Sequence, residues 1–125
     1  IDANKFFKGM FETALKKGEL IETVEFQVPI KSCYEKFPSP ASLYAMVGVY
    51  VAKYKSEVIV AVTGAQSVVY RCKEIENALN SNFSASAIDG VKIKSSGLNS
   101  DIHASSSYRA HLIKVLAKKV VAGCK

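Results

Sequence analysis

The sequence predicts an α+β fold in which an antiparallel sheet of three to four strands packs against helices. Segments with the alternating or β-branched patterns of strands gather early in the chain, while the clearest helical periodicity lies near its end. Strands and helices that are grouped in this way are typical of α+β rather than α/β domains. A length of 125 residues suits one domain, so we expect residues 1–125 to form a single unit.

The first thirty residues predict one helix and one strand. Apolar residues recur at helical spacing over residues 4–15, although Gly9 weakens this pattern. From residue 19 onward the pattern changes to alternation of apolar and polar residues. We therefore expect a strand over about residues 20–28, which Pro29 terminates.

The middle of the chain predicts the centre of the sheet. Residues 34–37 form a short extended piece, after which Pro38 and Pro40 exclude regular structure. The long apolar run over residues 42–52 is rich in Val and Tyr, and it predicts a buried central strand that a helical turn could precede.

A hairpin and a first helix are expected next. The charged residues 53–57 predict a hairpin loop, and residues 58–63 predict the antiparallel partner of the central strand. Residues 67–70 are expected to add a short strand. Residues 71–79 separate apolar from charged side chains at helical spacing, and they predict a helix.

The last element is the clearest helix, over about residues 105–120, and it follows a segment with only weak signals at 80–100. One of three serines is expected to cap its first turn. The residues expected to face the core are Tyr108, Leu112, Ile113, Val115, Leu116 and Val120. The residues expected to form a basic outer surface are Arg109, His111, Lys114, Lys118 and Lys119.

The charge balance favours anionic partners without identifying one. The chain has 17 Lys and Arg against 11 Asp and Glu, a net charge of +6, which attracts polyanions, phosphate groups or an acidic protein. The lysines are scattered, and Arg occurs only at Arg71 and Arg109. Because nucleic-acid readers concentrate Arg and aromatic residues in one stripe, we expect no nucleic-acid binding.

The cysteines and the hydropathy argue against metal-binding and membrane-spanning proteins. Cys33, Cys72 and Cys124 are far apart in sequence, and they are too few to hold zinc or an iron–sulfur cluster within this chain. We therefore expect no metal site. No apolar run reaches the ~18 residues of a membrane span, and no signal-peptide pattern occurs, so a cytoplasmic protein is expected.

No catalytic motif is present, and we assign no catalytic residue. Asp101 and His103, with the serines after them, contain the residue types of a hydrolase triad, but a helix cap is the favoured interpretation because adjacent positions seldom give that geometry. Arg109 is expected to form a structural ion pair, either with Asp101 or with Glu74 or Glu76. A small stand-alone hydrolase that uses His103 and the serines is a third hypothesis.

Lys36 is the strongest candidate for contact with a ligand. It lies between Tyr34 and Phe37, just before the loop that Pro38 and Pro40 bound. A cation beside aromatic rings suits a planar, phosphorylated ligand. On composition alone, a solvated lysine that discourages edge-to-edge pairing of the sheet is the competing interpretation.

Several short segments occur together in the order found in one known family, and they cover nearly the whole chain. They are Phe6-Phe7, Glu12 to Leu15, Gly18 to Val24, Tyr34 to Phe37, Ala41-Ser42, Tyr44-Ala45, Thr63 to Ala65, Arg71 with Glu76 and Leu79, Asp101 to Ser105, and Tyr108 to Leu112. The set resembles the C-terminal domain of the FAD-binding medium subunit of molybdenum hydroxylases, as in carbon monoxide dehydrogenase and xanthine dehydrogenase.

This resemblance implies a domain that covers the flavin, follows an upstream FAD-binding domain, and supports electron transfer from iron–sulfur clusters via FAD to an acceptor. It implies that Lys36, Tyr34 and Phe37 contact FAD, and that the molybdenum cofactor and iron–sulfur clusters belong to partner subunits. Many members carry Arg where this chain has Leu43. The isolated domain is not expected to be active. The alternative hypothesis is an interaction or scaffold module that keeps the fold without contacting flavin.

Overall fold

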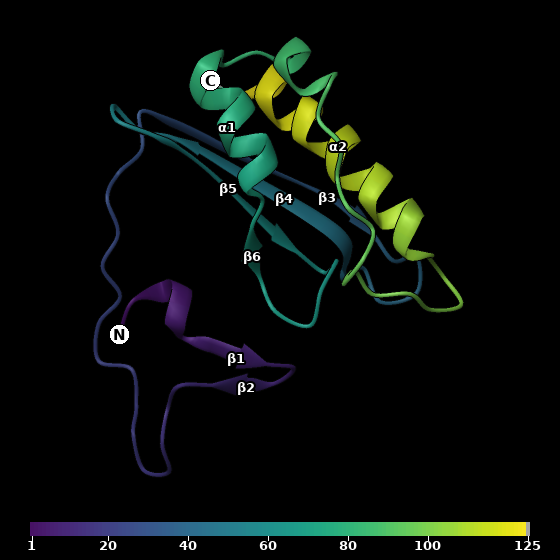
Figure 1. The fold of residues 1–125 in the computed structure, drawn as a ribbon. Coiled ribbons are helices and arrows are strands. Elements are labelled where there is room, and N and C mark those ends of the chain that lie inside the picture. The colour runs from purple at the N-terminus through teal and green to yellow at the C-terminus, as the bar shows by residue number, and fades with distance from the viewer. Residues whose placement is uncertain (125) are drawn as a thin grey trace.

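The computed structural model describes residues 1–124, and its centre is a four-stranded antiparallel sheet (Figure 1). The strands lie in the order β3, β4, β5, β6, so each one pairs with its neighbour in sequence. Their bounds are Lys31–Pro38 for β3, Ala45–Lys53 for β4, Val58–Thr63 for β5 and Tyr70–Arg71 for β6. The predicted α+β architecture is confirmed, and so are the central strand and its hairpin partner.

Valines at alternating positions explain why β4 and β5 form the centre of the sheet. Successive side chains of a strand point to opposite faces, and β-branched residues suit a pleated, packed surface. The valines on one face are fully or almost fully buried: Val47, Val49, Val51, Val58, Val60 and Val62. Because the register pairs Val49 with Val62 and Val51 with Val60, these side chains form one continuous apolar layer.

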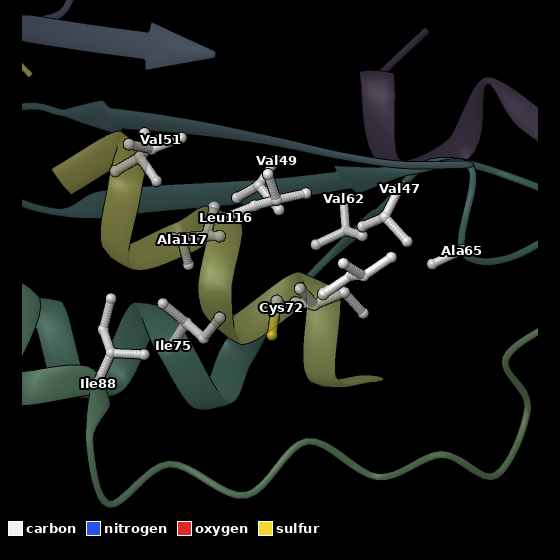
Figure 2. Packing of buried hydrophobic residues seen from close by; sticks show 14 of the residues in the cluster. Val47, Val49, Val51, Val62, Ala65, Cys72, Ile75, Ile88, Leu116 and Ala117 are labelled. Carbon is white, nitrogen blue, oxygen red and sulfur yellow. The ribbon is translucent and has the colours of Figure 1, made fainter. Parts of the chain in front are cut away.

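Both α-helices lie over this valine layer (Figure 1). Helix α1 spans Lys73–Ser81 and α2 spans Ser106–Gly123, and the short 3-10 helix η2, Ala85–Ile88, packs against both. Figure 2 shows Leu116 and Ala117 of α2 and Ile75 of α1 beside the valines of the sheet. The core therefore lies entirely between the sheet and its helices, and the opposite face of the sheet has no helix on it.

The face of α2 that meets the core differs in part from the predicted one. Leu112, Ile113, Leu116 and Val120 are buried as expected, but Tyr108 is 41% exposed and Val115 is 37% exposed. Arg109, expected on the outer surface, is only 4% exposed. The helix is therefore rotated so that small residues, including Ala110 and Ala117, approach the sheet. Periodicity favoured the larger apolar side chains, which was wrong for these positions.

The N-terminal predictions are wrong. Residues 4–15 form a 3-10 turn, η1 (Ala3–Lys5), and a small hairpin of β1 (Phe7–Gly9) and β2 (Glu12–Thr13). Residues 20–28 form no strand. No residue before Lys31 is buried, so neither pattern has a surface against which to pack, and packing supplies most of the stability of a short element.

The remaining boundaries shift slightly. The short strand expected over residues 67–70 is β6, Tyr70–Arg71, and the helix expected from residue 71 begins at Lys73. Ser105 caps α2, as predicted for one of the three serines, because its hydroxyl accepts the backbone N–H of Tyr108. Within residues 1–124, none of the helices combines the length and apolar composition that a bilayer crossing requires.

Candidate functional site

The candidate site lies on the sheet face that the helices leave uncovered. Strand β3 is an edge strand, and its register places Lys36 opposite Gly48 of β4, which in turn lies opposite Thr63 of β5. The next row pairs Tyr34 with Tyr50. Because directly opposed residues share a face, these five residues form one surface, which we call the open face.

Gly48 allows Tyr34 to lie across the sheet. A Cβ atom at Gly48 would lie 2.8 Å from Cγ2 of Thr63, closer than real side chains approach, and 3.0 Å from Cε2 of Tyr34, which is tighter than most real contacts. The tyrosine ring and the threonine methyl group therefore cover the glycine backbone, and Gly48 is itself buried. Tyr34 remains 46% exposed and Tyr50 37% exposed, so the open face presents aromatic surface to the outside.

Lys36 is fixed at the rim of the open face by the loop that follows β3. Its Nζ atom donates to the backbone oxygen of Leu43 at 2.9 Å. The loop is closed by two backbone hydrogen bonds, from Ser39 N–H to Tyr44 O at 2.7 Å and from Leu43 N–H to Ser39 O at 2.9 Å. Leu43 adopts a φ of 59°, which is costly for a residue with a side chain and is held by these contacts.

Phe37 lies on the other face of the sheet. Its ring packs edge-on against the ring of Tyr108 in α2, with centroids 6.3 Å apart and an interplanar angle of 89°. The structure thus brings Tyr34 and Lys36 together and separates Phe37 from them, as the alternation of side chains along a strand requires. Contact of these three residues with a ligand stays a prediction.

The base of the candidate site is held by Arg109 from the first turns of α2. Its Nη1 atom donates to Met46 O at 2.5 Å and to Gly64 O at 3.3 Å, and its Nη2 atom donates to Asp101 Oδ2 at 2.6 Å. The predicted ion pair with Asp101 is confirmed. One buried side chain therefore joins α2 to the start of β4 and the end of β5.

Asp101 has a structural role in the loop before α2. Its Oδ1 atom accepts the backbone N–H groups of His103 and Ala104, both at 2.9 Å. These two hydrogen bonds, and the nearby Arg109 guanidinium, hold the pKa of the Asp101 carboxyl below its usual range. Its carboxylate thus binds the main chain at His103, and the hydroxyl of Ser105 caps the helix.

A second buried charge, Glu76, holds α1 against the sheet. It accepts hydrogen bonds from Nε of Arg71 at 2.6 Å, from Nζ of Lys73 at 2.8 Å and from the N–H of Val60 at 3.0 Å. Burial alone would raise its pKa, but these donors together hold the pKa below the ordinary value. This network joins α1 to β5 and β6 and is structural.

Sequence reasoning missed Gly48, Tyr50 and Thr63 as members of the open face. The signal was present, because Val47, Val49 and Val51 fix which positions of β4 point into the core, and the intervening residues must point outward. Within residues 1–124, no three His, Cys, Asp or Glu side chains gather closely enough to hold a metal ion.

Comparison with known proteins shows a related fold. No family model matches the sequence. The chain shares its fold with a chain of the Cu,Mo-containing CO dehydrogenase, crystallised in a cyanide-inactivated form, with a TM-score of 0.69 and 18% identity over 98% of this chain and 47% of that one. The likeness shows a shared fold.

A closer relationship is visible in sequence. The chain is 34% identical to the glyceraldehyde dehydrogenase medium chain of Sulfolobus acidocaldarius over 132 aligned positions, which cover 95% of this chain and 46% of that protein. This match supports the resemblance to medium subunits of the molybdenum hydroxylase family. It spans about half the length of the proteins that it matches.

Proposed function

We propose that this chain acts as the C-terminal part of a FAD-containing medium subunit, where it covers the flavin and supports electron transfer from iron–sulfur clusters via FAD to an acceptor. The observation that carries the proposal is the open face, where Tyr34 and Lys36 lie side by side on a sheet whose other face is sealed by helices. The relationship to a glyceraldehyde dehydrogenase medium chain supports it.

The residues of the open face fit one side of a flavin. FAD, when bound, supplies one- and two-electron transfer chemistry, which a protein tunes through charge and hydrogen bonds near the ring. Lys36 would contribute a positive charge and a hydrogen-bond donor, and Tyr34 would contribute an aromatic surface. Phe37 would act from the opposite face, by fixing β3 against Tyr108.

The open face supplies only part of a FAD site. The sequence contains no glycine-rich motif that could cradle the pyrophosphate. We therefore expect an upstream FAD-binding domain to hold most of the cofactor, and we expect the isolated chain to bind FAD weakly and to show no turnover.

The exposed N-terminal segment supports such a neighbouring domain. Residues 1–30, which we call the N-terminal arm, contain no buried residue, and their large apolar side chains include Phe26, 80% exposed, and Val28, 86% exposed. Exposed apolar surface of this extent is typical of an interface. In the proposed assembly the upstream FAD-binding domain covers the arm, and partner subunits carry the iron–sulfur clusters and the molybdenum cofactor.

The proposal is tested by producing the chain together with an upstream FAD-binding domain of a medium subunit. A one-to-one complex that retains yellow flavin is expected, and Lys36→Ala should weaken FAD binding about tenfold and slow flavin reduction. Lys92→Ala, at an exposed lysine outside the open face, is the matched control and should leave both unchanged. Failure of the two domains to associate under any condition would contradict the proposal.

The N-terminal arm also favours a second candidate, an interaction or scaffold module that does not touch flavin. Both candidates predict association with the upstream domain, but only the flavin-covering role depends on the open face. If the assembled Lys36→Ala subunit kept its FAD affinity and its reduction kinetics, the scaffold function would be favoured.

A further inference from the structure

Three lysines lie at the end of the sheet away from the Lys36 loop. Lys31 begins β3 and lies directly opposite Lys53, the last residue of β4. Lys55 follows in the β4–β5 hairpin. Within residues 1–124, none of the three forms an ion pair. Like charges directly opposed across two strands destabilise a sheet, so the arrangement calls for a compensating group.

Phe83 organises the first two of these lysines. The Nζ atom of Lys53 lies 4.8 Å from the centroid of the Phe83 ring, and the Nζ atom of Lys31 lies 5.7 Å from it. A cation over an aromatic face is attracted by the negative charge of the ring face. This contact holds both ammonium groups near one ring, but it does not cancel their charge.

A concave groove adjoins the lysines. It has a volume of about 320 Å³ and lies between the β4–β5 hairpin and the end of α1, with Lys53, Lys55, Asn80, Asn82 and Phe83 in its lining. Asn80 accepts the N–H of Val58 through Oδ1 at 2.8 Å, which leaves its amide N–H groups available to donate. The one carboxylate in the lining, Glu57, pairs with Arg71 at 3.1 Å.

We propose that this groove binds a small phosphate-bearing anion. Lysine ammonium groups together with an amide donor suit a phosphate dianion, which can accept several hydrogen bonds at once. The volume is at the lower end of the range for small-molecule sites, which favours a small ligand over an extended acidic peptide. The shared chemistry is the phosphate group, either free or carried by a phosphomonoester such as a nucleotide.

An NMR titration of the full chain with inorganic phosphate, against sodium chloride at matched ionic strength, tests the proposal. Saturable shifts are expected for the amides of residues 53–58 and 80–83. Lys31→Gln with Lys53→Gln should weaken binding at least about tenfold. Lys16→Gln with Lys17→Gln removes the same charge from the N-terminal arm, as a matched control, and should not change the affinity.

Two further experiments identify the source of the phosphate and control for folding. Tighter binding of adenosine monophosphate than of phosphate, with none for adenosine, would indicate a nucleotide, whereas equal binding would indicate free phosphate; both support the proposal. Phosphate should raise the melting temperature of the natural chain and not that of the Lys31→Gln, Lys53→Gln variant. Shifts that follow ionic strength alone, or survive in that variant, would overturn the proposal, as would preferential binding of an acidic peptide.

Discussion

The side chain of Tyr34 covers the backbone of Gly48 on the neighbouring strand, in space that any other residue at position 48 would need. Thr63 closes the same space from the third strand. The three residues therefore join β3, β4 and β5 on a face that contributes nothing to the helix-covered core. The packing of Tyr34 and Thr63 on the open face therefore depends on the absence of a side chain at Gly48.

Gly48→Ala should destabilise the protein and displace the Tyr34 ring. Overpacking of this kind costs about 1–3 kcal/mol, which urea unfolding would measure. Adding Tyr34→Ala should relieve part of the crowding, so the double variant should lose less stability than the sum of the two single variants. Simple additivity would show that the two residues do not compete for space.

Arg109→Met should lower the stability of the protein more than the position of Arg109 on a basic helix suggests. The substitution leaves the carbonyl oxygens of Met46 and Gly64 without their charged donor in a buried position, and a loss of about 3 kcal/mol is expected. His111→Ala, at an exposed neighbour on the same helix, should change stability by less than about 0.5 kcal/mol. Equal effects of the two variants would contradict the anchoring role of Arg109.

Glu76 should make stability depend on pH in the acidic range. Its pKa is lower in the folded protein than in the unfolded chain, so its contribution is complete above the unfolded pKa of about 4.3 and is lost as pH falls through the folded pKa. Glu76→Gln should lower stability at neutral pH and flatten the acid limb of a plot of stability against pH. An acid limb as steep as that of the natural chain would assign the dependence to other groups.

Cys72 should resist alkylation in the folded protein. Burial is the main cause that raises the pKa of its thiol to about 11, and nearby Glu74 adds to the effect, so thiolate is scarce at neutral pH. Cys33 is only half-buried and should react first with a thiol reagent. Mass spectrometry of timed samples would show this order, and labelling of Cys72 as fast as in denaturant would contradict it.

Removal of residues 1–29 should leave the sheet and its helices stable. No side chain of this segment is buried, and the first backbone hydrogen bond to the sheet is made by Ile30, whose N–H donates to Lys53 O at 2.8 Å. The melting temperature should therefore change little, while association with an upstream FAD-binding domain should be lost. A shortened chain that unfolds would show that the arm supports the core.

The sequence predicts the sheet well because its strands depend mainly on near neighbours. Residues 58–63 alternate buried and partly exposed side chains, and this period of two is visible without any knowledge of the partner strand. The structure of the N-terminal arm was predicted wrongly for the opposite reason. Its apolar residues show periodicity, but which structure they adopt depends on a surface that residues 31–124 do not provide.

Arg109 and the open face show a second limit of sequence reasoning. Charge predicts an outward position for Arg109, yet carbonyl groups from β4 and the end of β5 create a buried site for it that only the tertiary fold brings together. Likewise, the prominence of Tyr34, Lys36 and Phe37 in sequence concealed that Phe37 faces the other way. Strand parity would have separated Phe37 from the other two.

The two faces of β4 expose adjacent residues to different kinds of natural selection. The side chains of Val47, Val49 and Val51 are constrained by the close-packed core, where a change in side-chain volume lowers stability. Gly48 and Tyr50 are constrained by the molecules that contact the open face. Among relatives that share the fold but differ in partner or cofactor contact, substitutions along this strand should therefore accumulate with a period of two. The positions that diverge would then show which face of the strand had changed its binding partner.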